Sequence, residues 1–370
     1  MIKVLMVVKA LEKTGVTSVM MAYFDHINKE KFQVDFACGD VYDNCYREHI
    51  EKYGGRFFSI ANRDKNLFGY IVKLSKIIKQ EHYDVVHVHG NSAMIFPELL
   101  SAAIAGAPVR IAHSHNTQCN HPKLDKLMRP LFNMLYTHGI GCSQEAGQWM
   151  FGDRIFTVIK NGTDTLRFAF NEHSRETIRQ RIAVKDEYLI GHVGYFNNQK
   201  NQDRIIEITA EMIDRGKNIK TILVGDGFRK AEMEAKAKAL GVEDSIIFYG
   251  NCDNVNEIMS AMDVFVFPSF FEGFPLVLLE AQASGLHCVS SNAVTRKTAE
   301  ATNAVSFVSL QSNDEQWIEA VENGIETTYG KRVEKSNFAI EMLSQYGYDY
   351  RQIVEDLENY YYKSIKEVKA

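Results

Sequence analysis

Short apolar, β-rich runs alternate with helical patterns along the whole chain, and the alternation starts again about halfway. Residues 1–8 have the composition of a buried strand and precede a helical pattern at 17–28. Residues 188–195 have that of another first strand and follow a polar helical pattern at 171–183. Such alternation predicts parallel sheets with crossover helices. Because 370 residues exceed what one hydrophobic core usually supports, we expect two successive doubly wound α/β domains joined near 164–170.

The remaining β-rich runs complete two sheets, and one long helical pattern closes the chain. The further strands that we expect lie at 33–38, 56–60, 85–89, 110–113, 139–142 and 157–159 in the first half, and at 219–224, 245–249, 264–268 and 287–290 in the second. The last helical pattern, 350–367, carries a stripe of tyrosine and aliphatic residues. Such a stripe must pack on another surface, and we expect that surface to lie between the domains.

The formal net charge of −5 hides an asymmetry between the two halves. Residues 1–165 carry 19 Lys and Arg against 16 Asp and Glu, a net +3, which leaves −8 for residues 166–370. A mildly basic first half fits an anionic acceptor or a membrane surface without demanding either. Because the sequence has no basic run, nucleic acid is not an expected partner.

The cysteines and the apolar runs both indicate in which cellular compartment the protein is expected. The six cysteines show no Cys-x-x-Cys pair and no metal-ligand spacing, which indicates reduced thiols. The first apolar run ends at Val8 and is followed by charged residues, which favours a strand over a signal peptide. The longest nearly apolar window, 92–109, contains Glu98 and two prolines and is not expected to span a membrane. We therefore expect a cytoplasmic protein.

The segment 272–280 carries two carboxylates, Glu272 in a Gly/Pro turn and Glu280 inside an apolar run. Pro275 suits the first position of a helix, and Gly285 suits the residue just past its end. A buried carboxylate is costly unless it is hydrogen-bonded, and the helix N-terminus between the two acids favours an anion such as a diphosphate. The pattern therefore indicates either a clamp on a nucleotide-sugar or a solvated helix with two surface acids.

Two pairs of alternating histidines end two of the expected strands; they are His87, His89, His113 and His115. Alternate residues of a strand share a face, so a zinc site is conceivable. No companion carboxylate lies at a familiar spacing. We therefore expect no metal, and favour a sugar- or phosphate-contacting role for His115, with histidines bonded to the backbone as the alternative.

Glycine-containing turns follow three of the expected strands. Gly15 comes after the first strand, but a single glycine is weak evidence for a phosphate loop. Gly225 and Gly227 follow a later strand without the third glycine of a dinucleotide-binding fingerprint. Lys200 lies where the loop after Gly194 meets an expected helix start, a position suited to a cation that binds a diphosphate.

Taken together, these segments resemble the family 4 glycosyltransferases, which have the GT-B fold, and within them the type that makes bacterial capsular polysaccharide or exopolysaccharide. The matching motifs follow in order along nearly the whole chain, at 83–89, 113–116, 142–143, 161–164, 191–194 with Lys200 and Asn201, 223–227, 272–280 and 283–285.

The resemblance implies two Rossmann-like doubly wound domains that face each other across a cleft. The first, residues 1–165 with about 349–370, would hold the acceptor, and the final helix would cross back to it. The second, residues 166–348, would hold a nucleotide-sugar donor, with a UDP-hexose as the expected class. The acceptor would be a glycan or lipid-linked saccharide, with possible peripheral contact at the inner membrane face. Transfer would retain the anomeric configuration, without a metal ion or cofactor.

The resemblance also assigns roles to individual residues. Glu272 would lie beside the sugar and diphosphate, Lys200 would neutralise the leaving diphosphate, and His115 would contact the transferred sugar. Glu280 would bind the donor ribose. The full set of expected donor-binding residues is Gly15, Gly194, Tyr195, Gly225, Tyr249, Asn254, Gly273, Phe274, Leu276 and Glu280.

One departure from the family pattern concerns the charge that faces the leaving group. The family usually has an Arg directly after the glycine at 194, and here that residue is Tyr195. Loss of one cation weakens transition-state stabilisation, unless Arg229 or Arg296 replaces it or Tyr195 donates a hydrogen bond. This departure leaves a rival function open, a catalytically weak binding subunit of a partner transferase. A nucleotide-sugar epimerase on the same fold is a separate rival hypothesis.

Overall fold

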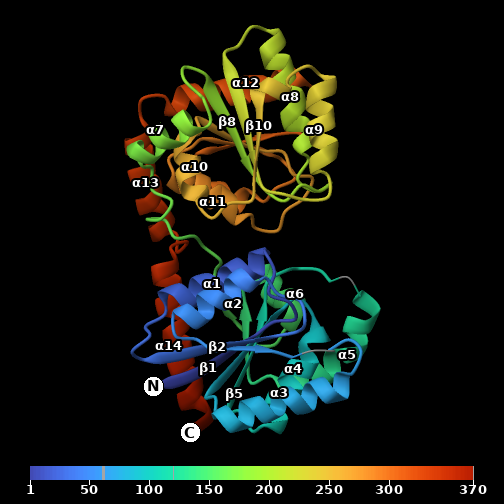
Figure 1. Cartoon of the computed structure of the whole chain (residues 1–370). Coiled ribbons are helices and arrows are strands. Elements are labelled where there is room, and N and C mark those ends of the chain that lie inside the picture. The colour runs from blue at the N-terminus through green and yellow to red at the C-terminus, as the bar shows by residue number, and fades with distance from the viewer. Residues whose placement is uncertain (61–62, 120, 370) are drawn as a thin grey trace. The chain divides into compact units, whose positions relative to one another are not determined.

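The computed structural model describes residues 1–60, 63–119 and 121–369, and they form two compact units (Figure 1). Unit 1 comprises Met1–Gly162 and the segment from Tyr350 onwards, and unit 2 comprises Thr163–Asp349. The expected domain boundary at 165 thus lies slightly past the one that the contacts define. None of the helices formed by the described residues is long and apolar enough to cross a membrane.

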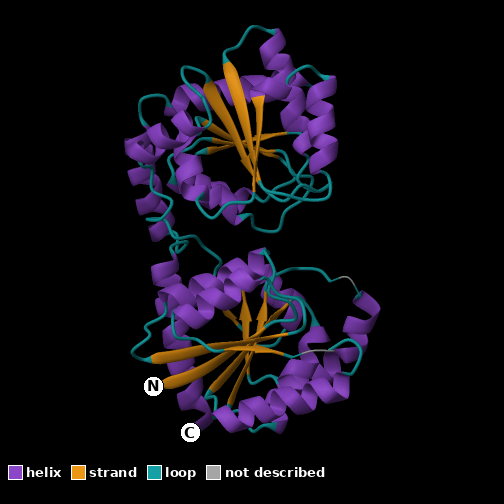
Figure 2. Cartoon of the chain, viewed as in Figure 1, coloured by secondary structure: helices purple, strands orange, loops and turns teal. Residues whose placement is uncertain are grey.

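Within its described residues, unit 1 has a seven-stranded sheet of order β3-β2-β1-β4-β5-β6-β7, and every neighbouring pair is parallel (Figure 2). The strands are β1 (Ile2–Val7), β2 (Phe32–Cys38), β3 (Phe57–Ser59), β4 (Val85–Gly90), β5 (Val109–Ser114), β6 (His138–Gly141) and β7 (Thr157–Val158). Their near-continuous apolar runs are typical of parallel strands covered by helices on both faces.

The helices of unit 1 are α1 (Gly15–His26), α2 (Asn44–Lys52), α3 (Leu67–Glu81), α4 (Phe96–Ile104), α5 (Pro122–Leu135), α6 (Gln144–Phe151) and α14 (Tyr350–Lys369), with the short helix η1 (Ala93–Ile95). Side chains of α3, α4, α5 and α6 share one buried cluster with β1 and β4, so these helices cover one face of the sheet. Helix α14 lies beside α1 (Figure 1).

The aromatic stripe of α14 finds its partner surface within unit 1 itself. Tyr361 is fully buried, its ring lies 6.0 Å from that of Phe32, and its hydroxyl is 2.7 Å from Nδ1 of His87. The backbone N–H of Asn28 donates to the Glu358 carboxylate over 2.7 Å. The return of the final helix to the first unit, implied by the family resemblance, is therefore present, and the stripe fills this unit's own core rather than a surface between units.

Unit 2 repeats the architecture, with a parallel six-stranded sheet of order β10-β9-β8-β11-β12-β13 within its described residues. The strands are β8 (Tyr188–Val193), β9 (Ile219–Val224), β10 (Ile246–Gly250), β11 (Val264–Phe267), β12 (Cys288–Ser291) and β13 (Val305–Val308). The helices are α7 (Glu172–Arg181), α8 (Gln202–Asp214), α9 (Lys230–Ala239), α10 (Val255–Ala261), α11 (Leu276–Ala283), α12 (Asp314–Thr328) and α13 (Arg332–Gln345), with the short η2 (Glu243–Ser245) and η3 (Arg296–Ala299).

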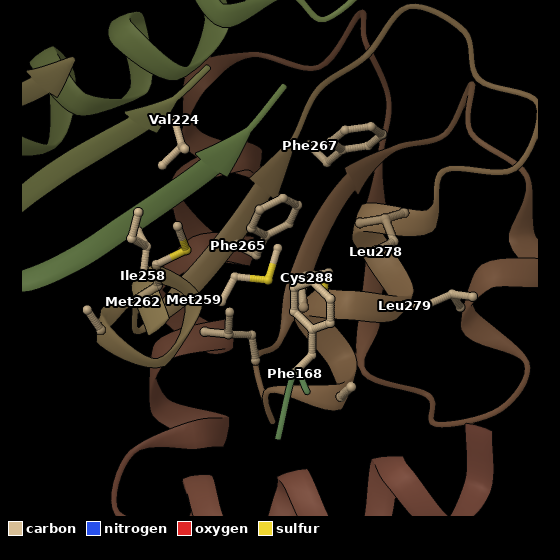
Figure 3. Packing of buried hydrophobic residues seen from close by; sticks show 14 of the residues in the cluster. Phe168, Val224, Ile258, Met259, Met262, Phe265, Phe267, Leu278, Leu279 and Cys288 are labelled. Atoms are coloured by element: carbon tan, nitrogen blue, oxygen red, sulfur yellow. The ribbon is translucent and has the colours of Figure 1, made fainter. Parts of the chain in front are cut away.

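Helix α11 is held by one of the two apolar clusters of unit 2. Leu278 and Leu279 of α11 belong to the same buried cluster as Phe265 and Phe267 of β11 (Figure 3). The second cluster, on the α8 and α12 side, includes the buried Trp317. Both faces of the sheet are thus packed, and the doubly wound fold expected from the alternation of strands and helices is confirmed in both units.

Candidate active site

The predicted donor-site residues of unit 2 follow the carboxyl ends of its central strands. Gly194 follows β8, Gly225 follows β9, and Glu272 lies in the loop after β11. Tyr249 is the penultimate residue of β10, and Asn254 directly precedes α10. Since all the strands are parallel, these positions share one edge of the sheet, which is where open α/β sheets bind ligands.

The loops after β8 and β9 run against each other without room for side chains. The backbone N–H of Gly194 donates to the Val224 carbonyl over 2.9 Å, and that of Phe196 to the Asp226 carbonyl over 2.9 Å. Gly225 has φ +133°, and a Cβ there would lie 2.2 Å from the carbonyl oxygen of Gly194. The two glycines therefore let the loops approach each other closely, so that backbone atoms line this edge of the sheet.

Gly225→Ala is expected to lower the free energy of unfolding by about 2–4 kcal/mol, because the positive φ and the backbone clash both cost energy. Gly216→Ala is the matched control: Gly216 also has a positive φ, +74°, but no atom lies within 4 Å of a Cβ there. The control should lose only about 1 kcal/mol. Urea denaturation measures both, and equal losses would show that the two loops do not need this close approach.

Lys200 and Glu272 form an ion pair across this edge. The Lys200 Nζ lies 2.7 Å from a Glu272 carboxylate oxygen, with only 18% and 12% of the two side chains exposed. The ammonium also lies 4.8 Å from the centre of the Phe267 ring. Sequence reasoning gave the two residues separate roles; the fold brings them together, so the cation is already oriented before any anion arrives.

The two loops that carry this pair are joined by hydrogen bonds. The backbone N–H of Phe270 donates to the Gln199 carbonyl over 2.8 Å, and Asn201 Nδ2 donates to the Pro268 carbonyl over 3.1 Å. Asn201 has φ +54°, a conformation that asparagine tolerates better than most residues. A bridge between Glu272 and Val294 holds the acid from its other side. The position of the ion pair is therefore set by backbone contacts.

Glu280 lies on α11 and is partly buried, and its carboxylate accepts no hydrogen bond from any residue that the structure describes. Burial raises the pKa of this carboxyl to about 7, while the positive charge of Arg167 works in the opposite direction. A desolvated carboxylate without donors is unfavourable in a folded protein unless a ligand supplies them. Arg167 is a neighbour that sequence reasoning missed; it follows the motif at 161–164, and this nearness was the only signal.

Helix α11 differs in detail from the expected one. It begins at Leu276, with Pro275 as its N-cap rather than its first residue, and no side chain caps its N-terminus. Gly285 follows its end with φ +71°, as expected. Leu276 is only half-buried, whereas Leu278 and most later residues are buried. Buried side chains therefore lie nearly all round α11 rather than on one face.

The other expected donor-site residues vary in surroundings. A Cβ on Gly273 would meet no atom within 4 Å, and the same holds for Gly15, which opens α1 in unit 1. The Phe274 ring packs 5.4 Å from that of Tyr348. Asn254 Nδ2 donates to the Glu257 carboxylate over 2.9 Å. No contact among the described residues of unit 1 explains Gly15, so its predicted role at the donor stays a prediction.

Tyr195, which replaces the usual arginine, is 56% exposed, and its ring lies 6.4 Å from that of Phe228 in an edge-to-face arrangement. Of the two arginines considered as substitutes, Arg229 binds the carboxylates of Asp203 and Glu232, so its charge is already neutralised. Arg296 is exposed, with its guanidinium 4.8 Å from the Phe307 ring. Arg296 therefore suits the substitute role better than Arg229.

In unit 1 the four histidines form a stacked column across β4 and β5. His115 Nε2 lies 2.9 Å from His89 Nδ1, and His87 Nε2 lies 3.1 Å from His113 Nδ1. Burial lowers the pKa of His87 and of His115 to about 3, so both imidazoles are neutral at pH 7. Nitrogens of His87, His89 and His113 lie within 4.8 Å of one another, but His87 uses both of its own for Tyr361 and His113.

Two parallel-sheet α/β domains, with Lys200, Glu272 and Glu280 in or after the loops at the carboxyl edge of the second, have the architecture of the GT-B glycosyltransferases. Residues 174–339 match the family described as glycosyl transferases group 1, and residues 13–167 match glycosyltransferase family 4. The chain belongs to the family 4 glycosyltransferases and is a glycosyltransferase.

Three similar proteins each cover three quarters of this chain or more. EpsF of Bacillus subtilis (strain 168), named as a glycosyltransferase, is 32% identical over 97% of this chain and 96% of its own length. An Escherichia coli protein named UDP-Gal:alpha-D-GlcNAc-diphosphoundecaprenol alpha-1,3-galactosyltransferase is 26% identical over 75% of this chain and 76% of its own. Anabaena Alr3699/HepE, solved with UDP, has a TM-score of 0.79 at 18% identity over 97% and 99% of the two chains.

Proposed function

We propose that this glycosyltransferase moves a hexose from a UDP-sugar to a glycan or lipid-linked saccharide, retains the anomeric configuration and uses no metal ion. The observation that carries the proposal is the preformed Lys200–Glu272 pair on the same sheet edge as Glu280, whose carboxylate accepts no hydrogen bond from the described residues. The names of two similar proteins support the substrate classes, since one was solved with UDP-glucose and another names UDP-Gal and a diphosphoundecaprenol acceptor.

In this proposal each end of the donor meets a group suited to it. The Glu280 carboxylate accepts hydrogen bonds from the ribose hydroxyls, which supplies the donors that it lacks. The diphosphate lies at the uncapped N-terminus of α11, where backbone N–H groups and the helix dipole favour anions. Lys200 adds a full positive charge there. Glu272 holds Lys200 and faces the sugar.

The transfer step that we propose breaks the bond between the anomeric carbon and the diphosphate oxygen and forms one to the acceptor hydroxyl on the same face. The leaving diphosphate takes the proton of that hydroxyl, so charge and atoms balance. Lys200 and the α11 terminus stabilise the negative charge that develops on the diphosphate, which is the kind of interaction that lowers a barrier most. In unit 1, the neutral His115 is proposed to contact the transferred sugar.

The raised pKa of Glu280 leads to a pH dependence of donor binding. Below pH 7 the carboxyl is largely protonated in the free protein, and a protonated acid accepts hydroxyl hydrogen bonds less well than a carboxylate. We expect the Kd for a UDP-sugar to rise by up to about tenfold per pH unit below 7 and to be flat above it. Calorimetry between about pH 5.5 and 8.5 measures this, and an equal slope in Glu280→Gln would contradict it.

A donor screen that detects release of nucleoside diphosphate tests the proposed function. It is run on the full chain with candidate lipid-linked saccharides, in the presence and absence of EDTA. Release from a UDP-hexose with a new glycosidic bond, unchanged by EDTA, supports the proposal. A product that is an epimerised nucleotide-sugar would favour the epimerase instead.

Tyr195 keeps a second candidate function open, that of a binding subunit for an active partner transferase. Its exposed phenol ring brings no positive charge to the leaving group, and Arg229 is held by two acids. Binding of a UDP-sugar without turnover, with any acceptor tested, would favour this subunit role.

A further inference from the structure

Helix α5 of unit 1 presents a continuous apolar stripe to solvent. Leu124, Leu127, Leu131 and Met134 are 40%, 67%, 37% and 79% exposed. Their spacing of three, four and three residues places them on one face of the helix. Single exposed apolar residues are ordinary on a protein surface, but a whole helix face of them marks an interaction site.

Other side chains of α5 pack against unit 1, so the helix is held with the stripe facing solvent. Phe132 and Leu135 are buried in the core cluster. The buried Asp125 accepts a hydrogen bond from the Ala93 N–H over 2.8 Å and binds Arg129 over 2.8 Å. Because its inner face already has partners, α5 is not a helix waiting to fold against its own domain.

A second helix on the same face of the sheet extends the apolar surface. Helices α3, α4 and α5 follow one another in space along this face (Figure 1). On α3, Phe68 is 79% and Val72 is 51% exposed. Both α3 and α5 begin after the carboxyl end of a strand of a parallel sheet, so Phe68 and Leu124 lie toward the same edge. We call this the α3–α5 surface.

The unpaired charges on the described part of the α3–α5 surface are positive, since the exposed Asp64 beside Lys65 pairs with Lys9 over 2.7 Å. Its exposed lysines are Lys65, Lys73, Lys76, Lys79, Lys123 and Lys126, and none of them forms an ion pair with any residue that the structure describes. The acids of α3, α4 and α5 are already paired. Glu81 binds Arg56 over 2.6 Å, Glu98 is buried against Arg63, and Asp125 is buried against Arg129.

We propose that the α3–α5 surface docks unit 1 on an anionic phospholipid bilayer, with the aliphatic and phenylalanine side chains in the headgroup boundary and the lysines on lipid phosphates. Apolar residues flanked by lysines, without free acids, are what an interfacial helix requires. A second copy of the chain fits less well, because a symmetric contact would place lysines against lysines. The six lysines also match the net positive charge of the first half of the sequence.

Docking by this surface would bring the enzyme to lipid-linked acceptors, and this role rests on the proposed function. The stripe starts at the N-terminal end of α5, which follows the loop that carries His115 after β5. The carboxyl edge of the unit 1 sheet is therefore the end of the surface nearest to the proposed acceptor site. A lipid-linked acceptor would be presented from the bilayer at that edge.

Vesicle co-sedimentation of the full chain tests the proposal. We expect binding to vesicles of phosphatidylcholine with phosphatidylglycerol to exceed binding to phosphatidylcholine alone by about tenfold or more, and to weaken with added salt. Leu127→Glu with Met134→Glu, and separately Lys123→Glu with Lys126→Glu, should each reduce binding by about tenfold or more. Val333→Glu with Phe338→Glu is the matched control, since both residues are exposed in unit 2, and should change nothing.

Two further measurements separate membrane docking from other effects of these substitutions. Leu127→Trp should show a blue-shifted fluorescence emission on the anionic vesicles, which reports insertion directly in a variant of an exposed site. UDP-sugar affinity should be equal in all these variants, so failure of docking is distinguishable from failure of the proposed function. The proposal would be overturned if wild-type protein does not bind anionic vesicles, or if it forms a dimer that Leu127→Glu abolishes.

Discussion

Replacing Lys200 by methionine should lower kcat by about 10²–10³-fold, the range found when a single group that stabilises a developing anion is removed. The methionine keeps the length of the side chain but removes the charge 2.7 Å from Glu272. Because Arg229 is bound by Asp203 and Glu232, it offers no ready replacement. The unpaired carboxylate of Glu272 would then add a second negative charge beside the diphosphate. Steady-state release of nucleoside diphosphate measures the loss.

The matched control is Lys217→Met. Lys217 also forms an ion pair in unit 2, with Glu322 over 2.6 Å, but it precedes β9 and so lies at the opposite edge of the sheet. Turnover in this variant should equal that of the wild type. Lys200→Met should also lower thermal stability, because it leaves the Glu272 carboxylate without its ion-pair partner. The double variant Lys200→Met with Glu272→Gln should recover that stability without recovering turnover. If Lys200→Met alone retains more than about half of the wild-type kcat, the lysine does not stabilise the leaving group.

The second large effect is expected for Glu280→Gln, which should raise the Kd for a UDP-sugar by about 10–100-fold. Hydrogen bonds from two hydroxyls to a carboxylate are charge-assisted, and those to an amide are not. The same change should stabilise the free protein above pH 7, by about 1–2 kcal/mol, because the buried charge is removed. Loss of ligand affinity with a gain of stability is the signature of a binding residue that is unfavourable in the empty site.

The sign of the stability effect follows from the raised pKa. The folded protein holds the Glu280 proton up to about pH 7, whereas the unfolded chain releases it near the ordinary glutamate pKa of 4.5. Between these values the folded state binds more protons, so wild-type stability falls as pH rises through this window. Denaturation at about pH 5 and 8 should show a smaller loss in Glu280→Gln. Glu211→Gln serves as control, because Glu211 is only partly buried and its carboxylate pairs with Arg215.

The fold was predictable because it depends on local patterns. Parallel strands buried on both faces are continuous apolar runs, and the runs at 1–8 and 188–195 each open a sheet. Gly285 takes a positive φ where a helix was expected to end. The unusual placement of Glu280 was also visible in the sequence, since an acid inside an apolar run is a local feature.

Contacts between distant residues were not predictable in the same way. Lys200 and Glu272 are far apart in the sequence, and their pairing depends on how the loops after β8 and β11 are joined. The ion pair between Arg229 and Asp203 is likewise a tertiary contact. The stripe on α5 went unrecognised because its period is that of an ordinary buried helix, and only the structure shows which face the core covers.

The central claim is that the carboxyl edge of unit 2 holds the donor. Hydrogen exchange of the full chain, with and without UDP-glucose or UDP-galactose, tests it directly, because bound ligand slows exchange where it orders the backbone. We expect slower exchange in peptides that cover 194–201, 225–228 and 272–280. Exchange that is unchanged in these three segments at saturating donor, or slowed only within residues 1–162, would contradict the account.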